Sequence, residues 1–90
     1  MADTHKVALV LHVHAGTGVL HQLTGVIAAL DGNITSVAIL GSRSGDEERT
    51  FFEVELPRPE TELLLERLRA LPVVKSVEAV RSMEKIYGKR

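Results

Sequence analysis

Four side chains that can ligate a metal or carry a proton stand in two closely spaced pairs in this 90-residue sequence. His12 and His14 are two residues apart, and so are Glu53 and Glu55. If both segments are β-strands, each pair shares one face of a sheet, because side chains alternate between the faces. Two imidazoles and a carboxylate are suitable zinc or nickel ligands. The alternative is cross-strand His–Glu pairing without metal, so these four residues are candidates and no metal or cofactor is assigned.

A second candidate site is the loop 15–18, which reads Ala-Gly-Thr-Gly and precedes an amphipathic helix pattern. Its small side chains leave room for a ligand, and glycine lets the backbone turn tightly and approach a ligand closely. The N-terminus of the following helix presents N–H groups and a partial positive charge, which favour a carboxylate. Asn33 adds two donors and an acceptor. The alternative is that Gly18 only makes a turn and Asn33 only starts a strand.

Six elements must position these residues. The periodicity of apolar residues predicts strands over 6–14, 33–40, 49–56 and 73–80, and helices over 18–31 and 60–71. The order is β-α-β-β-α-β. Because such crossovers are right-handed, it predicts an α+β fold, a ferredoxin-like βαββαβ sandwich. Its four-stranded antiparallel sheet carries two helices on one face and leaves the other face bare.

The same periodicity predicts the core. On the strands, the residues expected under the helices are Val7, Leu9, Leu11, Val13, Phe52, Val54 and Leu56. On the helices, the expected apolar stripes are Leu20, Leu23, Ile27 and Leu30, and Leu64, Leu68 and Leu71. Phe51 alternates with this set, so we expect it on the bare face together with the two glutamates.

Local signals predict how the elements end. Thr17 is the expected N-cap of the first helix, and Gly32 is expected to end that helix in the left-handed conformation. Gly25, in mid-helix, is expected to mark a close approach to the sheet, because glycine there is otherwise unfavourable. The polar stretch 41–48 is expected to be the turn of a hairpin.

Composition limits the classes of protein. Ninety residues make one domain, expected over 1–82, and the basic polar tail 83–90 either leads into a further domain of a longer protein or ends a short module. The net charge of −1 and the lack of a basic face argue against a nucleic-acid partner. No apolar run is long enough for a membrane span. The absence of cysteine fits a cytoplasmic protein.

Several proteins with this fold are excluded by their chemistry. RNA-binding modules need stacking aromatic residues, copper carriers need cysteines, and acylphosphatases need an arginine in the first loop. One family with this fold remains. Two segments resemble an ACT domain: 12–23, HVHAGTGVLHQL, and 31–34, DGNI. That family has a Gly-x-Leu turn opening its first helix and a Gly-Asn-Ile-like segment opening its second strand. The loop departs from the family's Asp/Asn-x-Pro-Gly form, so His14 or Asn33 would have to hold a ligand's amino group.

The resemblance implies a regulatory module rather than an enzyme. It implies a homodimer that binds an amino acid or a similar carboxylate and controls an attached or associated metabolic enzyme. We expect the dimer to form through the edge strand 33–40, because that strand carries no charge and an uncharged edge invites pairing. The predicted ligand-binding residues are His14, Ala15, Gly16, Thr17, Gly18, Val19, Leu20, Asn33 and Ile34. The alternatives are a dimerisation module without a ligand and a metal sensor using His12 and His14.

Overall fold

The computed structural model describes residues 4–80, without the side chains of 42–44. The predicted tail 83–90 lies outside the described residues. The elements are β1 (His5–His14), α1 (Val19–Ala29), β2 (Asn33–Ser44), β3 (Glu47–Leu56), α2 (Thr61–Arg69) and β4 (Val74–Val80). The predicted order of strands and helices is confirmed.

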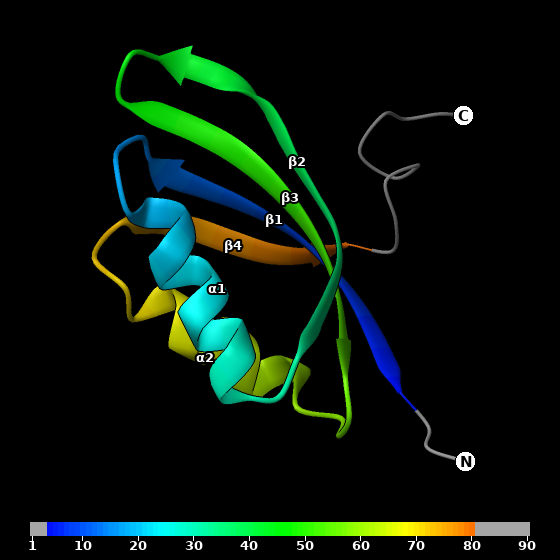
Figure 1. The fold of residues 1–90 in the computed structure, drawn as a ribbon. Helices are drawn as coiled ribbons and strands as arrows, with labels where there is room; N and C mark the ends of the chain where they lie inside the picture. The colour runs from blue at the N-terminus through cyan, green and yellow to red at the C-terminus, as the bar shows by residue number, and fades with distance from the viewer. Residues whose placement is uncertain (1–3, 81–90) are drawn as a thin grey trace, which may run out of the picture.

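The four strands form one antiparallel sheet in the order β2-β3-β1-β4. Both helices lie on one face of this sheet (Figure 1). The ferredoxin-like arrangement predicted from the sequence is therefore confirmed. β1 and β3 are central, and β2 and β4 are the two edges.

The main core lies between the sheet and the helices. Every strand residue predicted for it is buried: Val7, Leu9, Leu11, Val13, Phe52, Val54 and Leu56. On α1 the prediction for Leu20 is wrong, because its side chain is 49% exposed. Val19 takes its place, since Val19, Leu23 and Ile27 follow one another at intervals of four residues along the face that meets the sheet.

A second, smaller apolar cluster lies on the face of the sheet away from the helices. Ala8, Val10 and Phe51 form it, and Ala38, Leu40 and Val80 pack against it. Phe51 is on the predicted face, but it is only 1% exposed. The expectation of an open side of β3 is therefore wrong at this residue.

The ends of α1 differ from the predictions. Its N-cap is Gly18, in the left-handed conformation with φ 86°, and not Thr17. At the other end Asp31, not Gly32, has a positive φ, of 61°. A Cβ on Gly32 would lie 2.7 Å from Ile27 Cγ2 and 3.1 Å from Val54 Cγ1. Gly32 is therefore required for close packing rather than for its backbone angle.

Gly25 does not mark a close contact. The residue is exposed, and a Cβ added to it would meet nothing within 4 Å. The prediction of a tight approach between α1 and the sheet at this residue is wrong. No packing constraint among residues 4–80 explains this glycine.

The hairpin between β2 and β3 is tighter than the predicted turn 41–48, because only residues 45 and 46 lie outside the two strands. Its pairing is irregular on the side of β2. The register shifts between Ile34 and Ser36, and again between Ile39 and Gly41. Such bulges add twist and bend the strand. Between them, only residues 36–39 form a regular ladder.

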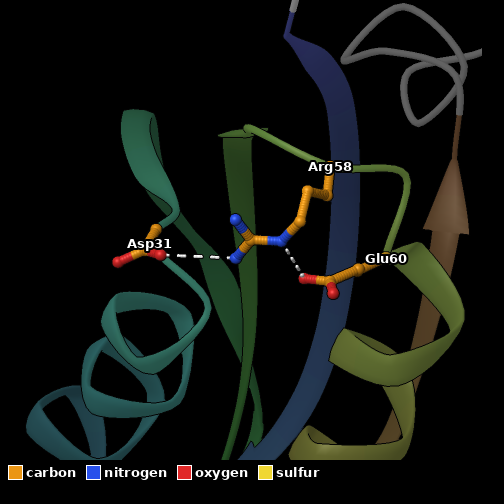
Figure 2. A network of polar contacts seen from close by, with 3 residues as sticks. All are labelled: Asp31, Arg58 and Glu60. Atoms are coloured by element: carbon orange, nitrogen blue, oxygen red, sulfur yellow. Dashed lines mark hydrogen bonds and ion pairs between the residues drawn. The ribbon is translucent and has the colours of Figure 1, made fainter.

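Ion pairs of Arg58 link the segment that follows α1 to the segment that precedes α2. The Arg58 guanidinium, in the turn before α2, lies 3.3 Å from Asp31 Oδ2, just after α1, and its Nε lies 3.3 Å from Glu60 Oε1 (Figure 2). These contacts raise the pKa of Arg58, the hydrogen bond to Asp31 having the largest effect. One side chain thus ties the end of the first helix to the start of the second.

Candidate functional site

The loop 15–18 lies where β1 ends, beside the tip of the β2–β3 hairpin and the start of β4 (Figure 1). Two backbone hydrogen bonds fix its entry. The His14 N–H donates to the Val73 carbonyl at 2.8 Å, and the Ala15 N–H donates to the Asp46 carbonyl at 2.9 Å. The loop is therefore held by two other parts of the chain before α1 begins.

The first turn of α1 has no side-chain cap, because its N-cap is Gly18. The Val19 N–H donates to the Gly16 carbonyl at 3.4 Å, and helical bonding resumes with the Gln22 N–H, which donates to the Gly18 carbonyl at 3.1 Å. The N–H groups of the first turn are otherwise without intrahelical partners. A Cβ on Gly18 would meet nothing within 4 Å, so the space above it is open. This geometry suits a carboxylate or another small anion.

Most of the predicted loop residues are accessible. His14, Gly16, Thr17 and Leu20 are exposed, as is Gly18, whereas Ala15 is half-buried. Val19 is 9% exposed and belongs to the main core. Its side chain is thus directed away from a ligand, and its N–H already has a partner.

Asn33 and Ile34 do not join this loop within one protomer. They start β2 at the far end of α1, and a helix of 11 residues is about 16 Å long. Asn33 pairs with Glu55, which in turn pairs with Lys6 near the start of β1. Asn33 is exposed there, and Ile34 packs against the main core. The predicted set therefore comes together only if a second protomer supplies part of it.

The register separates the candidate metal ligands. The pairs across β1 and β3 are His12 with Arg49, His14 with Glu47, Ala8 with Glu53, and Lys6 with Glu55. Glu53 is four residues from Arg49 along β3, or about 13 Å. His12 therefore faces a cation rather than a carboxylate. Residues 4–80 contain no group of three or more potential ligands placed to hold a metal ion.

Exposed apolar residues mark the edge strand β2. Val37 is 44% exposed and Ile39 is 57% exposed. They pair with Phe52 and Thr50, so they lie on the helix side of the sheet, where α1 does not cover them. Residues 33–40 of this strand include no charged side chain, and an uncharged edge is a ready template for pairing.

Neither helix within residues 4–80 has the length and apolar character required to cross a membrane. The described part is instead a two-layer sandwich, and its glycine loop opens the first helix. This architecture defines a ferredoxin-like domain with a candidate small-molecule site.

The chain belongs to the ACT domain family, whose sequence model matches residues 7–73. The resemblance noted in the glycine loop and in the start of β2 is thereby confirmed. ACT domains are regulatory domains, and the match places this chain among them.

Known relatives extend the match. The chain is 35% identical over 85 residues to an uncharacterised protein of Methanocaldococcus jannaschii, covering 94% of this chain and 38% of that protein. The ACT domain of a Chlorobium tepidum GTP pyrophosphokinase has a TM-score of 0.70 at 19% identity, covering 87% of this chain and all 100% of that one. The small subunit of Thermotoga maritima acetolactate synthase has a TM-score of 0.73 at 20% identity, covering 90% of this chain and 50% of that one. The chain spans little more than a third of the curated relatives it matches.

Proposed function

We propose that this chain is a homodimeric regulatory module that binds an amino acid or a related small carboxylate and controls an attached or associated metabolic enzyme. The observation that carries the proposal is the uncapped first turn of α1, with open space above Gly18. The carboxylate of the ligand would accept hydrogen bonds from N–H groups at this turn. The chain itself supplies the switch and no catalysis.

The dimer would form through β2. Val37 and Ile39 expose apolar surface there, and residues 36–39 form a regular ladder whose outer edge is available. If two copies pair antiparallel about a twofold axis, the start of β2 in one copy lies near the end of β2 in the other. Asn33 of one protomer would then approach the loop 15–18 of its partner. Such a dimer would explain why Asn33 and the loop 15–18 lie far apart within one protomer.

A ligand held in this way would bridge two protomers, so it would favour the dimer geometry that fits it best. Whatever is joined to the domain would respond to that shift. The relatives support this role. One similar structure is the ACT domain of a GTP pyrophosphokinase, and another is a subunit of acetolactate synthase. The archaeal relatives are also much longer than this chain, which fits an ACT domain whose tail 83–90 leads into a further domain.

Thermal unfolding with each of the twenty amino acids tests ligand binding. A ligand at 100 times its Kd stabilises a protein by about 2.7 kcal/mol, which raises Tm by several degrees in a domain of this size. Thr17→Glu would place a carboxylate beside the first turn of α1 and should abolish the shift. Thr17→Gln is the matched control without the charge and should keep it. A stable dimer whose Tm no amino acid changes would support the ligand-free dimerisation module instead.

Mixing two variants tests whether the site is shared. Thr17→Glu damages the loop, and Asn33→Ala removes the amide, so each homodimer should lose ligand binding. A mixed dimer contains one site with an intact loop and the partner's intact Asn33. Binding should therefore return to one site in each mixed dimer. If Asn33→Ala alone binds as well as the parent chain, Asn33 has no role in the site.

A further inference from the structure

Three polar side chains form a row across β3, β1 and β4 on the face of the sheet away from the helices. Arg49 lies opposite His12, and His12 lies opposite Ser76. Directly opposed residues of antiparallel strands point to the same side of a sheet and lie about 5 Å apart. His12 is two residues from Val10, which belongs to the apolar cluster on that face. Side chains that can donate hydrogen bonds therefore come together here from three strands.

Arg49 lacks a carboxylate partner, unlike the two lysines on the strands. Lys6 Nζ lies 3.9 Å from Glu55 Oε2. Lys75 Nζ lies 2.7 Å from Glu47 Oε2. Within the described part of the chain Arg49 forms no ion pair, and its Nε has no hydrogen-bond partner. Because a guanidinium is always charged, its donors are available to an anion from solution.

The neighbours of Arg49 in the sheet do not balance its charge. Glu47 lies two residues away on the same face, but Lys75 already engages it. On β2 the residue opposite Arg49 is Gly41, which has no side chain. Glu78 is on this face too, but β1 separates its strand from β3 by about 10 Å. A cation therefore stands beside the imidazole of the neighbouring strand, which disfavours a metal ion there and favours an anion.

We propose that Arg49, His12 and Ser76 form a binding site for phosphate, either the free ion or the phosphate group of a small ester. The guanidinium fork matches two phosphate oxygens. The imidazole N–H and the serine hydroxyl can donate to the others. A carboxylate has only two oxygens in one plane, so it uses donors from three strands less well than a tetrahedral phosphate.

The row is accessible and separate from the proposed amino-acid site. Ser76 is exposed, and His12 and Arg49 are half-buried. The amino-acid site is proposed at the first turn of α1, and both helices are on the other face of the sheet (Figure 1). The two ligands would therefore bind on opposite faces of the sheet, and neither site depends on the other.

NMR titration of the full chain, labelled with nitrogen-15, tests the site directly. With inorganic phosphate at constant pH and ionic strength, the Arg49 Nε–H signal and the His12 and Ser76 amide signals should shift and saturate. Acetate and chloride at the same ionic strength should not produce saturation. Saturation by glycerol phosphate at a lower concentration would identify an ester as the ligand, whereas saturation by phosphate alone would identify the free ion, and both results support the site. No saturable shift with either, or acetate binding as tightly as phosphate, would overturn the proposal.

Variants distinguish a built site from general attraction to positive charge. Arg49→Gln should weaken phosphate binding by roughly tenfold or more, since a hydrogen bond to a charged group is lost. Ser76→Ala should weaken it less. Lys6→Gln is the matched control, because it removes the same charge from the same face, six residues from His12 along β1, or about 20 Å. The control should leave the Kd unchanged, and an equal loss in both charge variants would overturn the proposal. The titration of the parent chain remains decisive if a variant fails to fold.

Discussion

Lys75 Nζ lies 2.7 Å from Glu47 Oε2, and the ion pair joins the two strands that flank β1. Glu47 starts β3 opposite His14, and Lys75 lies at the irregular start of β4. The hydrogen bond to Glu47 raises the pKa of Lys75 above its ordinary value of 10.5. The ion pair therefore links β3 to β4 at the end of the sheet beside the loop 15–18. The attraction is strongest while the lysine is protonated.

Lys75→Gln should lower Tm at neutral pH, and the size of that effect should depend on pH. Because the folded-state pKa is raised, the contribution is complete below the ordinary value of 10.5 and is lost as the pH rises through the folded-state pKa. The Tm difference between the parent chain and the variant should thus stay constant up to about pH 10 and shrink above it. Thermal unfolding across this range measures it. A difference that persists undiminished at higher pH would show that lost packing, not charge, causes it.

Replacing Arg58 with either glutamine or lysine should lower the thermal stability of the domain. Its guanidinium contacts Asp31 and Glu60 through separate nitrogens, and an ammonium group cannot reproduce that fork. Arg58→Gln and Arg58→Lys should both lower Tm modestly. The loss should shrink at 1 M salt, where charges are screened within about 3 Å. If Arg58→Lys matches the parent chain, a single point charge is sufficient there.

The two glycines around α1 should respond in opposite directions to the same substitution. At Gly32 an added methyl group would lie 2.7 Å from Ile27 Cγ2 and 3.0 Å from the Ile27 carbonyl oxygen. Overpacking of this kind typically costs about 1–3 kcal/mol. At Gly25 the methyl group meets nothing within 4 Å, and alanine is the better helix former. Gly25→Ala should therefore stabilise the domain by about 0.4–1 kcal/mol.

Chemical denaturation of both variants gives the two free energies of unfolding, and each variant is the other's control. Equal destabilisation by the two substitutions would contradict the packing argument at Gly32. A destabilising Gly25→Ala would indicate that a partner approaches this exposed face of α1, since nothing within residues 4–80 obstructs a methyl group there.

Ile39→Lys should convert the proposed dimer into a monomer. The side chain is 57% exposed in the single chain, so lysine should leave the monomer fold intact. Across a twofold axis the substitution brings two positive charges onto a shared edge, and a charged edge strand resists pairing. Analytical ultracentrifugation measures the change. Ser76→Lys, on the opposite edge strand β4, is the control and should leave the dimer unaffected.

Periodicity was sufficient to predict the fold, because the strand residues alternate strictly between two environments. Leu9 and Phe52 were assigned to the main core from this alternation alone, and both are fully buried. The family resemblance depended on two short segments with a fixed position in that order. Such signals are local, and the order of elements is read directly along the chain.

Contacts between distant segments could not be predicted in the same way. The candidate metal site failed because the sequence places His12 and Glu53 on the same face but not in the same register. The role of Gly32 depends on Ile27 and Val54, of which the second belongs to another element. Threonine and glycine are similarly favoured at an N-cap, so capping preference does not decide between Thr17 and Gly18. The left-handed backbone at residue 18 decides it, because glycine adopts that conformation without steric cost.

The sheet order also has a consequence for synthesis on the ribosome. β1 is the first strand to be translated, yet its neighbours in the sheet are β3 and β4, which are translated last among the strands. This strongly apolar strand therefore emerges with no partner until residue 56 has been made, and its second edge stays unpaired until residue 80. Since unpaired apolar strands are prone to aggregate, nascent chains that stall between these two points should depend most on chaperones.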